Sequence, residues 1–135
     1  MIRSSDDREA GAAAVEMALL APLLFMLIFG IISYGLAFLQ LQTVRSAMRE
    51  GARASAVGAT AAQVQSKVLG SSLGALPTGT SLDLSKASCA GGVGSDTTVK
   101  LAWNGNGIAV SIPFVPKITL HPDVSSTFQC EVRSP

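Results

Sequence analysis

The feature that most constrains this chain is a run without any Asp, Glu, Lys or Arg that extends from Met17 to Val44. An α-helix rises about 1.5 Å per residue, so the run could span roughly 40 Å, whereas the hydrocarbon core of a bilayer is about 30 Å thick. In the first half of the run, apolar residues lie on all sides of the expected helix, which is typical of a segment surrounded by lipid or packed in an apolar helix bundle. The run therefore predicts a membrane-spanning helix.

The flanks of this run indicate that the helix is kept in the mature protein. A secretory signal peptide has a short apolar stretch followed by small residues at the cleavage site. Here the apolar stretch is longer, and the small residues Gly11–Val15 lie in front of it, followed by Glu16. We expect the membrane part at about residues 17–40 and the whole helix, with a polar continuation, at residues 12–58.

Composition limits both the fold and the function. A chain of 135 residues has room for one membrane helix and one small domain with a thin core. Its formal net charge of +1 gives no electrostatic signature of nucleic-acid binding. No nucleophile motif or phosphate-binding motif occurs, and the single histidine, His121, lacks metal-ligand partners at a recognisable spacing. We expect no enzyme activity, no cofactor, no metal and no nucleic-acid partner.

The two cysteines, Cys89 and Cys130, lie in the polar C-terminal half. They are either unrelated buried thiols or a disulfide, and their even number beyond a membrane segment favours the disulfide. Closing a loop of about forty residues would stabilise the fold by roughly 4 kcal/mol in the chain-entropy model. A disulfide needs an oxidising compartment, so it would place the C-terminal domain outside the cytoplasm.

The distribution of arginines argues against this orientation. Arg3 and Arg8 precede the membrane segment, whereas Arg45, Arg49 and Arg53 follow it, and basic residues normally mark the cytoplasmic side. We give the disulfide precedence because long C-terminal domains are translocated largely regardless of charge.

A face of small residues follows the apolar run. Ala47, Gly51 and Ser55 recur at a spacing of four, which lets another backbone approach closely. This helix-packing face would contact either the protein's own C-terminal domain or a second subunit, and the sequence leaves both open.

Residues 59–135 are expected to form an extracytoplasmic α+β domain. Thr60 is a candidate N-cap for a short helix that ends near Leu73. Alternating or β-branched segments predict strands at residues 81–88, 97–103, 108–115 and 124–132. Residues 104–107, Asn-Gly-Asn-Gly, predict a hairpin between the second and third of these strands. The expected fold class is thus α+β: a long N-terminal transmembrane helix, a short helix and a small antiparallel sheet.

Glu16 lies at the boundary of the membrane segment, where it is either an ordinary interfacial residue or a functional carboxylate. Cleavage after Gly11 would free an α-amino group on Ala12, four residues before Glu16. In a packed bundle, the carboxylate of one helix can neutralise the new terminus of its neighbour.

The order Gly11-Ala-Ala-Ala-Val-Glu16-Met17, followed by a long apolar helix, resembles the class III signal of type IV pilins and pseudopilins. More narrowly, residues 11–30 together with Arg49-Glu-Gly-Ala-Arg53 resemble TadE-like proteins of the tight-adherence (Flp pilus) machinery. The resemblance implies cleavage of the leader, residues 1–11, by a prepilin peptidase.

A structural role follows from the same resemblance. It implies a minor pilin-like subunit in the inner membrane, with its N-terminus in the cytoplasm, that can enter an extracellular pilus. Its partners would be membrane lipid, the prepilin peptidase, other pilin-like subunits and the Tad assembly platform. The alternative is an uncleaved single-pass anchor that displays a small β-domain for adhesion or ligand binding.

Overall fold

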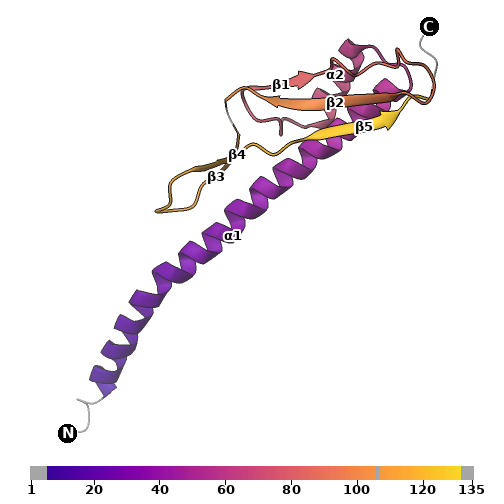
Figure 1. Ribbon diagram of the computed structural model, residues 1–135. Helices are drawn as coiled ribbons and strands as arrows, with labels where there is room; N and C mark the ends of the chain where they lie inside the picture. The colour runs from indigo at the N-terminus through magenta and orange to yellow at the C-terminus, as the bar shows by residue number, and fades with distance from the viewer. Residues whose placement is uncertain (1–5, 106, 132–135) are drawn as a thin grey trace.

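The computed structural model describes residues 6–105 and 107–131. The described chain is a mixed α+β protein, which confirms the expected fold class (Figure 1). Its elements, in order, are α1 (Asp6–Ala56), α2 (Ala61–Ser71), β1 (Thr80–Asp83), β2 (Asp96–Trp103), β3 (Ile108–Val110), β4 (Ile118–Leu120) and β5 (Ser125–Gln129).

Helix α1 is 51 residues long, which corresponds to roughly 75 Å. It begins at Asp6, before the expected start at residue 12, because residues 6–11 contain no proline and the helix continues through Gly11. It ends at Ala56, shortly before the expected end at residue 58. Gly58 has a φ of +90° and donates its N–H to the carbonyl of Ser55, so it turns the chain away.

The short helix α2 begins as its sequence predicts. Thr60 is the N-cap, and its side chain accepts the backbone N–H of Gln63 while the Gln63 side chain accepts the N–H of Thr60. This reciprocal capping box satisfies two donors at the helix start. Val64 and Val68, one turn apart, are its buried residues.

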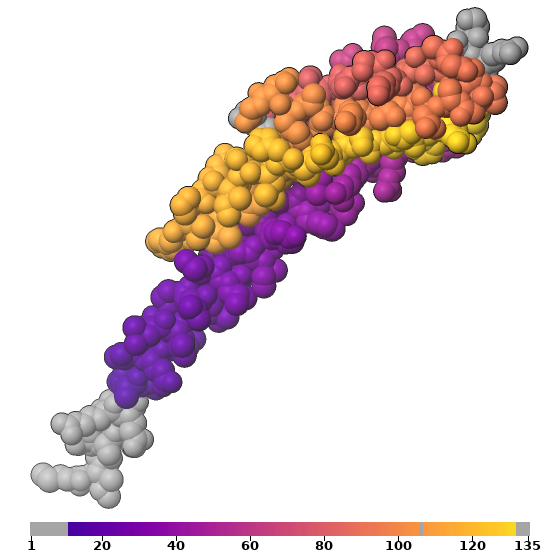
Figure 2. Space-filling view, in the orientation of Figure 1, coloured from indigo at the N-terminus to yellow at the C-terminus, as the bar shows by residue number. Residues whose placement is uncertain are grey.

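The two halves of α1 have different surroundings. The N-terminal half projects beyond the rest of the protein, whereas the C-terminal half carries the domain (Figures 1 and 2). Large apolar side chains are exposed along α1 from Val15 to Leu39. The helix is long and apolar enough, from Gly11 onward, to cross a membrane, and it fits a single-pass membrane protein.

The strands form two separate antiparallel sheets. The first has the order β1-β2-β5, with Leu82 opposite Leu101 and Val99 opposite Ser126. The second contains β3 and β4, with Ala109 opposite Thr119.

The prediction of a hairpin across residues 104–107 is wrong. Strand β2 is flanked by β1 on one edge and β5 on the other, so neither edge is left for β3. Instead β3 pairs with β4, a three-residue strand that the sequence pattern did not predict. Ile108 and Val110 are buried against Ala37 of α1, and this contact replaces the expected pairing with β2.

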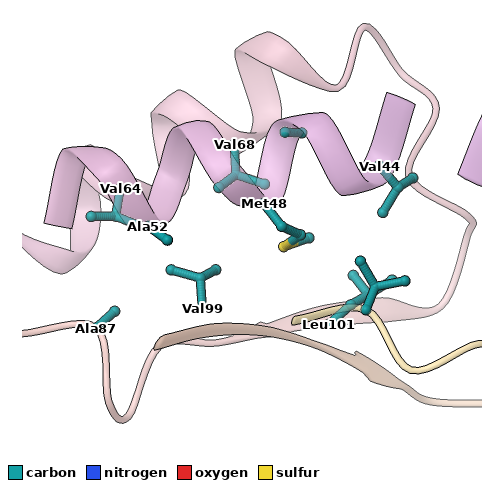
Figure 3. Close-up of a cluster of buried hydrophobic side chains, with 10 residues drawn as sticks. Val44, Met48, Ala52, Val64, Val68, Ala87, Val99 and Leu101 are labelled. Atoms are coloured by element: carbon teal, nitrogen blue, oxygen red, sulfur yellow. The ribbon is translucent and has the colours of Figure 1, made fainter. Parts of the chain in front are cut away.

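The main hydrophobic core lies where α1 meets α2 and β2 (Figure 3). Val44, Met48 and Ala52 recur every four residues and form one face of α1. They pack with Val64 and Val68 of α2, Val99 and Leu101 of β2, and Ala87 of the loop between β1 and β2. The C-terminal half of α1 is therefore the central element of the domain as well as the continuation of the apolar helix.

Candidate functional site

The segment predicted to be a processing signal lies on the free half of α1. Gly11, Ala12 and Glu16 are all helical and exposed. Residues four apart share a helix face, and Ala12 and Glu16 are separated by about 6 Å along the axis. An α-amino group created at Ala12 would therefore lie on the same face as the Glu16 carboxylate.

Between this signal and the domain, α1 offers a continuous apolar surface. A Cβ atom added at Gly11 or at Gly35 would meet no other atom within 4 Å, so the helix is unobstructed at both positions. Such a surface can contact lipid or the apolar helices of neighbouring subunits. Its largest exposed side chains include Leu19, Leu23, Phe25, Ile31, Tyr34, Leu36 and Leu39.

The small face of Ala47, Gly51 and Ser55 is buried within the protein's own domain. A Cβ atom placed at Gly51 would overlap Val68 Cγ2 of α2 and lie 3.6 Å from Val64 Cγ1. The sequence left two partners open for this face, and in the structure its partner is the protein's own domain. This face is therefore covered by α2 and β2.

Ser55 carries a buried polar link between α1 and the first sheet. Its Oγ lies 2.6 Å from Thr97 Oγ1, and the Thr97 hydroxyl is 3.2 Å from the carbonyl oxygen of Lys86. Both hydroxyl groups have an acceptor when the Ser55 hydroxyl donates to Thr97 Oγ1 and the Thr97 hydroxyl donates to the carbonyl of Lys86. Both hydroxyls are fully buried, so the pair fixes how β2 sits on α1.

Cys89 and Cys130 form a disulfide, with 5.6 Å between their Cα atoms. The bridge lies at the C-terminal end of α1, where Cys89 Sγ is 3.3 Å from the carbonyl oxygen of Ser55. Next to it, the backbone N–H of Glu131 donates to the carbonyl of Ala56, one of the last carbonyls of the helix. The disulfide thus holds the end of β5 and the loop after β1 against the end of α1.

The charged groups of the domain lie at its surface. Arg49 and Arg53 are exposed and Arg45 is half-buried, at successive positions four apart on α1. Hydrogen bonds from the hydroxyl and the backbone N–H of Ser85 hold the pKa of Asp83 below its ordinary value, with the charges of Lys100 and Lys86 adding to the effect.

No group of three or more His, Cys, Asp or Glu side chains is placed to hold a metal ion among residues 6–105 and 107–131. His121 is exposed and meets Trp103 edge to face, with 5.5 Å between the ring centroids. The Trp103 indole N–H donates to the carbonyl of Pro122. This corner therefore packs side chains together and presents no set of metal ligands.

One surface feature was missed by the sequence analysis. The β3–β4 hairpin lies along α1, where Ser33 donates its hydroxyl to the carbonyl of Ser111 over 2.7 Å. Between the hairpin and the helix is an apolar groove of about 310 Å³, lined by Tyr34, Ala37, Phe38, Leu41, Ile108, Leu120, His121 and Pro122. The available signals were the aromatic residues Tyr34 and Phe38 within the apolar run.

These features define a class of protein with one long apolar helix whose second half is the scaffold of a small, disulfide-bonded α+β domain. The model of the family described as TadE-like protein matches residues 11–53. The match confirms the resemblance over the segment that carries Gly11, Glu16 and the apolar run. No curated protein and no solved structure matches this chain.

Proposed function

We propose that this protein is a minor pilin-like structural subunit for the assembly of Tad/Flp-type pili, processed by a prepilin peptidase, and not an enzyme. The observation that carries the proposal is the match of residues 11–53 to TadE-like proteins over a helix whose N-terminal half is apolar and uncovered. Residues 1–11 would be the cytoplasmic leader. Lipid, the peptidase, other pilin-like subunits and the Tad assembly platform would be its partners.

The free half of α1 suits a subunit that exchanges one apolar environment for another. Leaving the bilayer for a filament replaces lipid tails with the apolar faces of neighbouring helices, so apolar burial alone contributes little to the exchange. Packing and polar contacts then decide association. Glu16 is the carboxylate placed to make such a contact, with the α-amino group of Ala12 on a neighbouring helix.

The disulfide supports an orientation with the domain outside the cytoplasm. Disulfides persist in oxidising compartments, and the Cys89–Cys130 bridge lies in the domain that follows the apolar helix. We therefore assign the N-terminus to the cytoplasm and the helix to the inner membrane. Alkylation of protein from cells should reveal both thiols only after reduction. Thiols that react without reductant would contradict this orientation.

The deciding experiment is the intact mass of the protein from cells with and without the prepilin peptidase. We expect the loss of residues 1–11 only when the peptidase is present. Gly11→Leu should block the loss, because the peptidase reads a small residue before the cut. Gly35→Leu is the matched control, since it changes an equally unobstructed helical glycine outside the signal, and it should be processed normally. An N-terminus at Ala12 in Gly11→Leu, or retention of residues 1–11 with active peptidase, would favour the uncleaved anchor.

A further inference from the structure

The connection between β3 and β4, residues 111–117, is an exposed apolar tip. Phe114 is 97% exposed, and Val115 is 39% exposed. Phe114 also has a φ of +66°, a conformation that bulky residues rarely adopt, and it stands between Pro113 and Pro116. The backbone therefore holds a large aromatic side chain outward at a position where nothing in the described chain covers it.

The tip is fixed to the apolar helix. The hydroxyl of Ser33 donates to the carbonyl of Ser111, and Ile112 Cδ1 lies 3.9 Å from where a Cβ atom of Gly30 would stand. The hairpin thus reaches along α1 toward its uncovered half (Figure 2). Its contacts with the helix at Gly30 and Ser33 lie well inside the stretch from Val15 to Leu39 that is rich in exposed apolar side chains.

The distance along α1 from Gly11 to the level of the tip is close to the thickness of a bilayer's hydrocarbon core. Gly11 and Gly30 are separated along the helix by about 28 Å, close to the hydrocarbon thickness of about 30 Å. Tyr34, which is 65% exposed, lies one turn beyond Gly30, and tyrosine is enriched at the level of the headgroups. A helix that enters the hydrocarbon near Gly11 would leave it where the hairpin tip meets the helix.

We propose that the tip is a lipid-contacting element that rests on the outer boundary of the bilayer. In this arrangement Phe114 and Val115 enter the edge of the hydrocarbon, and Lys117 reaches the headgroups. The hydrocarbon-spanning part of α1 is then residues 11–30, rather than the residues 17–40 expected from composition. The inference rests on the proposed function only in requiring that α1 spans a membrane.

The second sheet argues for this depth. Within residues 6–105 and 107–131, β3 and β4 pair only with each other, so each strand has an edge of unpaired backbone groups. Open sheet edges do not occur in lipid-exposed positions within the hydrocarbon. Because Ile108 and Val110 pack against Ala37, a span that reached residue 40 would immerse both strands in lipid. A boundary near Gly30 leaves the strands in water and immerses the tip alone.

The proposal is tested with single tryptophans in the full chain, placed in vesicles of phosphatidylethanolamine and phosphatidylglycerol. In a Trp103→Phe background, Phe114→Trp reports the tip, and Val93→Trp, at an exposed loop residue, is the aqueous control. Leu20→Trp and Ile28→Trp report depth along the helix. Each probe is read by quenching with aqueous iodide and with lipids brominated at different acyl positions. If Trp103→Phe does not fold, the probes are read in the native background after subtracting the Trp103 signal.

We expect the tip probe, Phe114→Trp, to be protected from iodide severalfold more than Val93→Trp and to be quenched best by bromines near the top of the acyl chain. Leu20→Trp should be the deepest probe, because residues 20 and 21 are the middle of the span 11–30. A deepest signal at Ile28→Trp would instead support the span 17–40 and overturn the proposed depth.

Three other outcomes also overturn the inference, and they have distinct meanings. If the tip probe is open to iodide while Leu20→Trp is deep, the helix spans the membrane and the tip stays in water. If the tip probe is protected from iodide but not quenched by any brominated lipid, the tip is covered by protein, such as a second copy. If none of the helix probes is quenched by lipid, the spanning helix itself fails, and with it the membrane part of the proposed function.

Discussion

Gly51 is a position where the domain depends on the absence of a side chain. It lies in α1 opposite α2, and a Cβ atom there would overlap the buried Val68. Valine has one strongly preferred side-chain rotamer in a helix, so Val68 cannot easily rotate out of the way. We predict that Gly51→Ala destabilises the domain although alanine is the better helix former.

The magnitude follows from two opposed effects. Replacing glycine by alanine inside a helix contributes about 1 kcal/mol of stability, and overpacking a well-packed core costs about 1–3 kcal/mol. Because the overlap is with a constrained and fully buried side chain, we expect a net loss of about 1–2 kcal/mol. Gly70→Ala in α2 is the matched control, since a Cβ atom there meets nothing within 4 Å, and it should stabilise by about 0.5–1 kcal/mol.

A double-mutant cycle isolates the contact. Val68→Ala alone should cost about 2 kcal/mol, since it removes buried methyl groups and leaves a cavity. In Gly51→Ala/Val68→Ala the new methyl group enters the vacated space, so the pair should cost about 1 kcal/mol, much less than the sum of the single losses. Urea unfolding of the full chain in detergent, followed by the fluorescence of Trp103, measures each free energy of unfolding.

Two results would refute this reasoning. If Gly51→Ala stabilises the domain as much as Gly70→Ala does, α2 does not pack on α1 as closely as the structure has it. If the two substitutions add without coupling, Val68 is not the residue that Gly51 accommodates.

Three further perturbations test other parts of the molecule. Replacing Cys89 and Cys130 together by serine should lower the free energy of unfolding by about 4 kcal/mol, from the loop that the disulfide closes, and a loss below about 1 kcal/mol in urea titrations would show that the bridge is dispensable. Thr97→Val should cost about 1–3 kcal/mol because it leaves the hydroxyl of Ser55 buried without its partner. Adding Ser55→Ala should restore most of that loss. If the double variant is no more stable than Thr97→Val alone, the two hydroxyls are not hydrogen-bonded to each other. Glu16→Ala should insert and be cleaved normally, but it should reduce the recovery of pilus components in co-purification by orders of magnitude. The loss should be larger for Glu16→Lys and smaller for Glu16→Asp. Normal piliation with Glu16→Lys would make Glu16 an ordinary interfacial residue.

Local sequence signals predicted the helices and the cysteine bridge well. The uncharged run and the alanine-rich segment after it specify α1, and the Thr60–Gln63 capping box fixes the start of α2. These signals act within a few residues, or through chemistry that does not depend on the path of the chain. The disulfide needed only two cysteines and an oxidising side, and the structure brings them together across 41 residues of sequence.

These local signals did not predict which strands pair. Asn104 and Gly105 do turn the chain, and Gly105 has a φ of +110°, but a turn does not decide which strand lies next. The pairing of β2 with β5, and the burial of Ile108 on Ala37, depend on contacts distant in sequence. Likewise, the small face of α1 could have met any partner, and the position of Val68 was needed to show which one it meets.

The depth of the helix in the membrane also decides whether the carboxylate of Glu16 needs a nearby positive charge. If residues 17–40 spanned the hydrocarbon, Glu16 would lie at its edge, where water and headgroups can solvate a carboxylate. If the hairpin tip sets the outer boundary near Gly30, Glu16 lies about 7 Å inside the cytoplasmic edge of the hydrocarbon, where a lone charge is costly. An amino terminus at Ala12 could then be drawn to it, from the same chain or from a neighbour, since opposite charges attract more strongly in a low dielectric. A span that keeps β3 and β4 in water would therefore also give cleavage at Gly11 a physical role, because the new α-amino group would be the cation that balances a Glu16 carboxylate inside the hydrocarbon.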